Sequence, residues 1–171
     1  MHMLTSHGKN NIIIDPKMLL HPIHCFSFGF GAGLLPKMPG TWGTIVTFLF
    51  FLPMMQLSST SYLLVFAVLT VFSIYAADYT SKSLGEHDHS AIVCDEIVGY
   101  LLVLFFIPQN LICMLLSFVL FRLFDIVKPW PINFIDENIA GGLGIVVDDI
   151  AAALYAIAVF LLLQLLYSYV L

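Results

Sequence analysis

Charge is confined to a few short stretches of this chain, and long apolar segments separate those stretches. The densest of them, residues 121–152, carries five acids, one Arg and one Lys between two apolar segments. Only 10% of the 171 residues are charged and 60% are hydrophobic, whereas about a quarter of the residues in soluble domains are charged. With a mean hydropathy of +0.99, the sequence is typical of an integral membrane protein of one domain.

Five apolar segments are predicted to form membrane-embedded helices. They are residues 41–57, 62–82, 92–107, 111–127 and 146–171. A helix needs roughly 20 apolar residues to cross a bilayer, so the first and third segments qualify only if their polar ends are included.

The N-terminal part is predicted to differ from the rest. A Gly-rich run between residues 16 and 35 favours an interfacial or re-entrant helix. We therefore expect an all-α, polytopic membrane protein with a lead-in of little fixed structure at residues 1–22. Residues 23–171 are expected to form a single membrane-embedded domain.

Charged residues all fall toward one end of this predicted bundle. The connections at 53–61 and 108–110 and the C-terminal tail carry no charge, so all six basic residues, eleven acids and six histidines lie toward the other end. By the positive-inside rule, the charged end faces the cytoplasm. This places the N-terminus inside and the C-terminus outside.

Acids and bases from three segments meet at the charged end. An ionised side chain deep in a bilayer costs about 2.5–3.5 kcal/mol, and such groups are functional by default. Two acids open the third segment, three charged residues end the fourth along one helical face, and two acids open the fifth. The candidate site residues are Asp95, Glu96, Arg122, Asp125, Lys128, Asp148 and Asp149.

A divalent cation would offset the repulsion among these acids. Mg²⁺ suits carboxylate ligands and keeps water positions for a phosphate. Zinc is disfavoured, because His87 and His89 are only two residues apart and no cysteine lies nearby. Cys25, Cys94 and Cys113 show no pairing pattern and are predicted to be free thiols.

Other polar residues have simpler interpretations. Asp78 and Lys82 are spaced for an ion pair at a helix end, and Asp136 and Glu137 are predicted to lie in a solvated loop. Trp130, between two prolines, is predicted to anchor the chain at the membrane interface. For the histidines at 87 and 89, structural and functional roles both stay open.

Two groups of glycines call for an explanation. Gly29, Gly31 and Gly33 favour close helix packing, since no strand precedes them and no phosphate-loop Lys follows. The glycines between 141 and 144 are predicted to turn the loop tightly into the last helix. Exposed amides there are a second possibility, as a site for a phosphate oxygen.

Four motifs resemble the phosphatidylglycerophosphatase A family. They are PGTWGT at 39–44, HDHSAIVCDEIVG at 87–99, FRLFDIVKPWPI at 121–132 and GGLGIVVDDIAA at 141–152. The resemblance runs from about residue 28 to the end of the last apolar segment. The motifs are specific in combination, whereas each alone is weak.

The resemblance implies a Mg²⁺-dependent hydrolase of the bacterial inner membrane, with its site at the cytoplasmic face. Its substrate would be phosphatidylglycerol phosphate, and its products phosphatidylglycerol and phosphate. A phospholipid in the bilayer is the expected partner and nucleic acid is not, while the oligomeric state stays open.

Within that interpretation each candidate residue has an expected role. Asp125 is a further metal ligand, the general base or the nucleophile of an aspartyl-phosphate intermediate. Arg122, Lys128 and His89 are expected to bind the substrate phosphate. The expected Mg²⁺ ligands are Asp95, Glu96, Asp148 and Asp149.

Three alternatives remain at the level of sequence. Another lipid phosphomonoester, such as phosphatidic acid, offers the same terminal phosphate. An ion-coupled transporter is disfavoured because the outer half of every segment is uncharged and no inverted repeat is visible. A non-catalytic assembly subunit would not require so many clustered acids.

Overall fold

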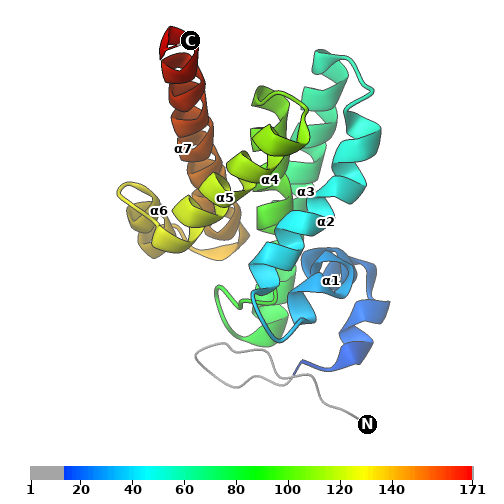
Figure 1. The fold of residues 1–171 in the computed structure, drawn as a ribbon. Helices are drawn as coiled ribbons and strands as arrows, with labels where there is room; N and C mark the ends of the chain where they lie inside the picture. Colours follow the sequence, from blue (N-terminus) through cyan, green and yellow to red (C-terminus); the bar gives the residue numbers. More distant parts are fainter. Residues whose placement is uncertain (1–13, 171) are drawn as a thin grey trace.

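The described part of the chain is built from helices alone. A computed structural model describes residues 14–170, and no strand occurs among them. The elements, shown in Figure 1, are the 3-10 helices η1 (Pro16–Leu20) and η2 (Gly29–Leu34) and the α-helices α1 (Pro22–Ser27), α2 (Pro39–Met54), α3 (Ser59–Leu84), α4 (Cys94–Phe106), α5 (Leu111–Val127), α6 (Ile132–Asn138) and α7 (Gly141–Val170).

Local signals explain where the long helices begin and end. The Ser58 side chain caps α3 by accepting a hydrogen bond from the Ser61 amide, and Asn110 caps α5 in the same way through Cys113. Gly85 ends α3 in a left-handed conformation. Lys128 ends α5 in a left-handed conformation as well, directly before Pro129.

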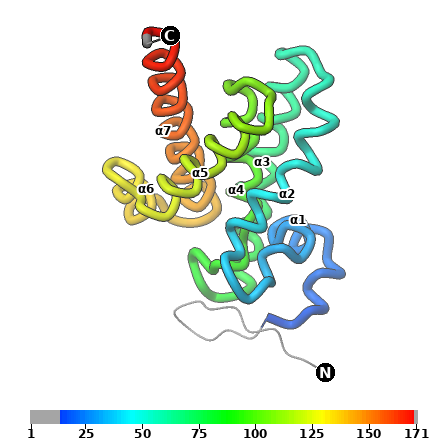
Figure 2. Tube along the Cα trace, in the orientation of Figure 1, coloured from blue at the N-terminus to red at the C-terminus, as the bar shows by residue number. Residues whose placement is uncertain are grey.

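Helix α4 is the centre of the fold. It packs against α2, α3, α5 and α7 (Figures 1 and 2). Its residues are almost all buried, among them Ile97, Tyr100, Leu101 and Leu104, and they form the main core with Phe121 of α5 and the alanines of α7. A helix that is apolar all round is stable only when other elements enclose it.

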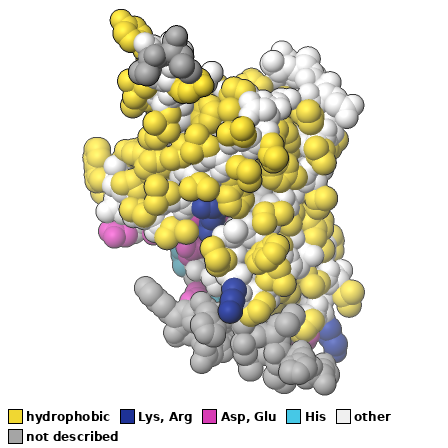
Figure 3. Space-filling view, in the orientation of Figure 1, with side chains coloured by type: hydrophobic (Ala, Val, Ile, Leu, Met, Phe, Trp, Pro, Cys, Tyr) yellow, Lys and Arg dark blue, Asp and Glu magenta, His cyan; other side chains and the backbone are white. Residues whose placement is uncertain are grey.

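The predicted separation of charge is confirmed as a feature of the fold. The α2–α3 and α4–α5 connections and the C-terminal end of α7 lie together at one end of the molecule, as Figure 1 shows. In Figure 3 the charged side chains on the visible face lie in its middle and lower parts, and the upper part is hydrophobic or uncharged.

Two helices are long and apolar enough to cross a membrane by length and composition. They are α3, with 26 residues, and α7, for which 29 residues qualify. Helices α2, α4 and α5 have 16, 13 and 17 residues. The expectation of five full spans is therefore not confirmed, because α2, α4 and α5 are shorter than the roughly 20 residues that a span needs.

The last helix begins five residues earlier than predicted, at Gly141 instead of Val146. Its glycines lie within the helix, because α7 approaches α3 closely: a Cβ at Gly142 would collide with the Ile74 carbonyl. The amides at this helix start already have partners. Gly141 N donates to His87 Nε2 (2.6 Å), and Gly142 N donates to Asp78 Oδ1 (3.3 Å). They are thus not the open phosphate site that the sequence allowed.

The region around the predicted lead-in is also more structured than expected. Residues 1–13 lie outside the described residues, but η1 and α1 are short helices within 16–27. Ile14 is buried with Phe28, Leu34 and Ala91. The expected interfacial helix at 16–35 is instead three short helical pieces, η1, α1 and η2. The last of them is itself kinked, because Phe30 and Gly31 have positive φ angles.

Close packing through the glycines of η2 agrees with the prediction from sequence. A Cβ at Gly33 would collide with the backbone carbonyl of Ala91, directly before α4, and one at Gly29 would lie 2.6 Å from Val93 Cγ2. The N-terminal segment can pack on the start of α4 only because these side chains are absent.

We expect Gly33→Ala to lower the free energy of unfolding by about 1–3 kcal/mol, the usual cost of overpacking. Thermal unfolding of purified protein in detergent would measure it. A Gly33→Ala protein as stable as wild type would contradict the packing argument.

Candidate active site

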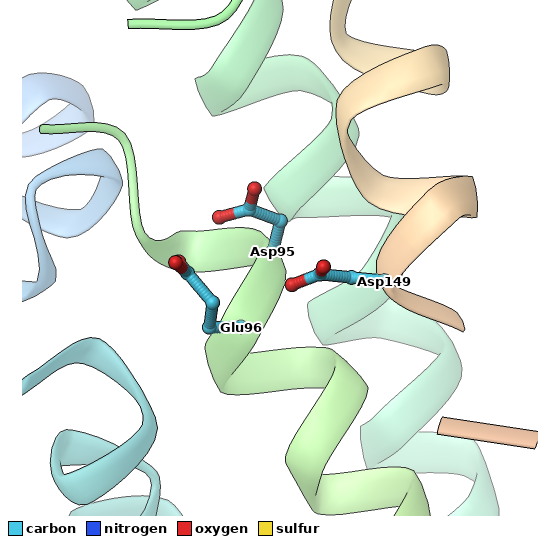
Figure 4. Close-up of side chains that lie close together, drawn as sticks. All are labelled: Asp95, Glu96 and Asp149. Carbon is cyan, nitrogen blue, oxygen red and sulfur yellow. The ribbon is translucent and has the colours of Figure 1, made fainter. Parts of the chain in front are cut away.

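Three carboxylates meet at the start of α4. Asp95 and Glu96 stand in its first turn, and Asp149 reaches them from the third turn of α7 (Figure 4). One oxygen from each of the three lies within 4.8 Å of the others. All three residues are at least nine-tenths buried.

These carboxylates have the properties of a cation site. Asp95 Oδ1, Glu96 Oε2 and Asp149 Oδ2 are buried and have no hydrogen-bond partner. Buried acceptors without partners are costly, and oxygen donors at this spacing suit a hard divalent cation. The residues present therefore fit the group that the sequence analysis expected.

Arg122 lies between this group and Asp125. Its Nη1 is 2.5 Å from Asp125 Oδ2 and 3.4 Å from Glu96 Oε1. The Asp125 pair uses the i, i+3 spacing on α5 that the sequence predicted. The Arg122 Nε is buried and without a partner, so the guanidinium keeps a donor for a further acceptor.

Lys128 forms a second ion-pair group beside the first. Its Nζ is 2.6 Å from Asp148 Oδ2 and 2.8 Å from Asp136 Oδ1. Burial lowers the pKa of Lys128, but the two carboxylates raise it by more, so the net shift is upward and the side chain stays charged.

Both groups line a single cavity of about 360 Å³. Six carboxylates and two cationic side chains contribute to its wall, so negative charge is in excess. The charged lining residues are Asp88, Asp95, Glu96, Arg122, Asp125, Lys128, Asp148 and Asp149. The structure thus brings together every predicted site residue except His89.

His89 lies away from this cavity. Its ring is fully buried, its Nδ1 accepts a hydrogen bond from the Ala91 amide, and its Nε2 is 3.7 Å from Glu86 Oε2. Burial lowers the pKa of His89, which favours the neutral ring. The structure therefore gives His89 a place in the loop before α4 and does not bring it to the predicted phosphate site.

Asp148 is in the cavity but not with the three carboxylates. One of its oxygens binds Lys128, and the other accepts a hydrogen bond from the Asp149 amide. Adjacent residues on a helix point about 100° apart. Only Asp149 therefore faces α4, and Asp148 faces Lys128.

Asp136 is not the purely solvated loop residue that the sequence suggested. It stands on α6, a short helix where a loop was expected, and its contact with Lys128 joins that helix to the site. Glu137, by contrast, is exposed, as predicted. The helix-end ion pair of Asp78 and Lys82 is also confirmed, at 2.6 Å.

Sequence reasoning gave no role to two further residues of the cavity wall. Gly40, in the first turn of α2, lies so close to the site that a Cβ on it would collide with Glu96 Oε1 and the Arg122 guanidinium. Asp88 also lines the cavity. The PGTWGT motif signalled that residue 40 matters, but only the tertiary contact shows how.

A family model described as "Phosphatidylglycerophosphatase A" matches residues 25–164, which include this entire cavity. The chain belongs to the phosphatidylglycerophosphatase A family. It is thus a member of a family of lipid phosphatases, and the transporter and assembly-subunit alternatives are set aside.

Family members among curated proteins cover most of the chain. A phosphatidylglycerophosphatase A of Haemophilus influenzae is 40% identical over 148 residues, covering 85% of this chain and 91% of the relative. The Escherichia coli K12 phosphatidylglycerophosphatase A is 40% identical over 133 residues, covering 77% of each chain.

A third relative is also named as a phosphatase, but for a different lipid. A putative phosphatidylinositol-3-phosphatase of Bacteroides thetaiotaomicron is 37% identical over 137 residues, covering 75% of this chain and 84% of the relative. No solved structure matches the chain.

Binding of a divalent cation at the three carboxylates should stabilise the fold. We expect saturating Mg²⁺ to raise the midpoint of thermal unfolding in detergent, since a ligand at 100 times its Kd adds about 2.7 kcal/mol. Asp95→Asn and Asp149→Asn should abolish the shift, and EDTA should reverse it in wild type.

Asp136→Asn is the matched control for that measurement. It removes an acid from the same end of the molecule but leaves the three carboxylates intact. An equal loss of the Mg²⁺ shift in Asp136→Asn would point to general charge screening instead of a bound ion.

Proposed function

We propose that this protein hydrolyses the terminal phosphate of phosphatidylglycerol phosphate, with Mg²⁺ as cofactor, giving phosphatidylglycerol and inorganic phosphate. Family membership and the names of two 40% identical relatives support the reaction. The cavity carries the proposal, because it combines carboxylates without partners and two cationic side chains. Phosphoryl transfer depends on such positioned positive charge.

Asp95, Glu96 and Asp149 are the residues that would hold the cation. Asp148, which sequence reasoning grouped with them, would act through Lys128 instead. When bound, the cation supplies Lewis-acid polarisation of the phosphoryl group and lowers the pKa of a bound water.

Arg122 and Lys128 would bind the substrate phosphate. The planar guanidinium suits bidentate contact with phosphate oxygens, and its orientation is fixed by Asp125 and Glu96. Lys128 adds a point charge in the wall of the same cavity, held in place by Asp136 and Asp148.

Asp125 is the proposed general base. The carboxylate lines the charged cavity, and its ion pair with Arg122 fixes its orientation. It would accept a proton from water as the water oxygen attacks phosphorus. The bond from phosphorus to the ester oxygen breaks, and the lipid alkoxide leaves as the hydroxyl after taking up a proton.

A covalent variant uses the same residues. Asp125 itself would attack phosphorus, and water would then hydrolyse the aspartyl phosphate. Acid quenching of a turnover with radiolabelled phosphate distinguishes the two, because only the covalent route leaves label on Asp125.

We further propose that α2, α3, α4, α5 and α7 are all membrane-embedded, with the charged end at the cytoplasmic face of the inner membrane. Exposed apolar side chains along α3, such as Leu64, Val68 and Val71, support contact with lipid. The location of all charge at one end supports the orientation. A site there would meet a lipid phosphate at the headgroup plane.

A second candidate substrate class has a specific observation in its favour. One relative, 37% identical, is named putative phosphatidylinositol-3-phosphatase, which by name acts on a different lipid phosphomonoester. We expect purified protein to release phosphate from phosphatidylglycerol phosphate at the highest kcat/KM. A higher value for phosphatidic acid or phosphatidylinositol 3-phosphate would move the assignment to that substrate.

Loss of one site carboxylate should abolish turnover. We expect Asp95→Asn, Asp125→Asn and Asp149→Asn to lower kcat by at least about 100-fold, because each removes a group that acts on the reacting phosphate. Phosphate release from phosphatidylglycerol phosphate in mixed micelles, with and without Mg²⁺, measures this. Membrane insertion should be unchanged.

Glu137→Gln is the control for these variants, since Glu137 is exposed on α6 and outside the cavity wall. It should keep full activity. Turnover retained in all three Asn variants would refute the assigned site.

A further inference from the structure

Helices α2 and α5 flank α4 on two sides without closing over it. Both pack on α4, whereas α2 and α5 make no extensive contact with each other along their described lengths. In Figures 1 and 2, α4 lies between the other two. A crevice therefore runs along α4, open between α2 and α5.

An apolar cavity of about 250 Å³ lies in this crevice. Its wall includes Ile45 and Phe48 of α2 and Leu115 and Phe118 of α5, with Tyr100 of α4 at its base. The Tyr100 hydroxyl donates to the Met114 carbonyl (2.7 Å), so the one hydroxyl of the wall is already bonded within the protein. The cavity suits a hydrocarbon.

The apolar cavity lies next to the charged one in order along the same three helices. Glu96 and Tyr100 are one turn apart on α4, and Arg122 and Phe118 are one turn apart on α5. On α2, Gly40 lines the charged cavity and the apolar wall begins at Ile45. A molecule with a phosphate at one end and a hydrocarbon chain at the other matches a charged cavity followed by an apolar one.

The length of the crevice matches one leaflet of a bilayer. From Arg122 back to Leu111, which also lines the apolar cavity, the rise of α5 is about 16 Å. Half of a hydrocarbon core of about 30 Å is about 15 Å. The apolar wall is therefore about as long as one acyl chain in a bilayer.

We propose that the crevice between α2 and α5 binds one acyl chain of the lipid substrate while the phosphate occupies the charged cavity. This inference rests on the proposed lipid phosphatase function and adds the site that selects for a long acyl chain. It also makes the crevice the route by which the substrate enters sideways from the bilayer.

A larger apolar pocket elsewhere does not fit this occupant. It has about 560 Å³ and lies between the start of α5 and the end of α7, with Pro108, Leu116 and Tyr167 in its wall. This pocket has no lining residue on α2 or α4, and its wall on α7 begins at Phe160, about three turns beyond Asp149. It therefore does not follow the helices that line the charged cavity around Glu96 and Arg122.

The test fills the crevice and compares two chain lengths. Ile45→Trp and Leu115→Trp place a large ring in the groove, at positions that are 44% and 58% exposed. Leu49→Trp and Val119→Trp are matched controls on the same helices, exposed but outside the groove wall. Each protein is assayed with dioleoyl and with dihexanoyl phosphatidylglycerol phosphate.

We expect the groove variants to lose about tenfold or more in kcat/KM for the dioleoyl lipid, since excluding even two methylene groups costs that much. The dihexanoyl lipid should be affected less, and the controls should match wild type on both. Unchanged dioleoyl activity, or equal loss on both lipids, would overturn the proposal.

Photocrosslinking tests the acyl-chain site independently of the proposed reaction. Phosphatidic acid with a diazirine midway along an acyl chain should label residues 45–48 and 111–118 in wild type, whether or not the lipid is hydrolysed. Labelling of 160–167 instead, or crosslinking of two copies through the groove, would overturn the acyl-chain site. Groove labelling without phosphate release from any lipid would overturn only the proposed function.

Discussion

Crowding of negative charge at the start of α4 is the constraint on which the rest of the structure depends. Oxygens of Asp95, Glu96 and Asp149 lie within 4.8 Å of one another. Two unit charges at that distance repel by roughly 3.5 kcal/mol at an effective dielectric of about 20. The α4 dipole returns only about 0.3–1 kcal/mol per anion, and Arg122 pairs with Glu96 alone among the three. The cation that we propose for this site would offset the repulsion that remains.

The helices around α4 each supply one part of that arrangement. Helix α7 brings Asp149, and α5 brings Arg122 and Asp125. Helix α2 has a glycine, Gly40, in its first turn, so its backbone can approach the site. The short helix α6 supplies Asp136, which contacts Lys128 at the end of α5. The positions of the charges thus follow from packing on one buried, apolar helix.

Sequence patterns predicted the parts of this structure that depend on local spacing. The convergence of Asp95, Arg122, Asp125 and Asp149 followed from helices whose charged ends lie together, and Arg122 and Asp125 pair at i, i+3 as expected. Local spacing in the sequence could not predict the contacts between distant segments. Nothing local distinguishes Asp148 from Asp149, because only the rotation of α7 against α4 decides which of them faces the other acids. The early start of α7 was missed for a related reason: glycine disfavours helix, but close packing on α3 overrides that preference.

The capping of α7 by residues of the α3 region has a mechanical consequence. His87 and Asp78 hold the first two amides of α7, and His87 is the neighbour of Asp88 in the cavity wall. These two hydrogen bonds tie the start of α7, which carries Asp148 and Asp149, to α3 and to the loop that carries Asp88. Helices α2 and α5 have no such tie to each other, so we expect motion that widens the cavity to come from them.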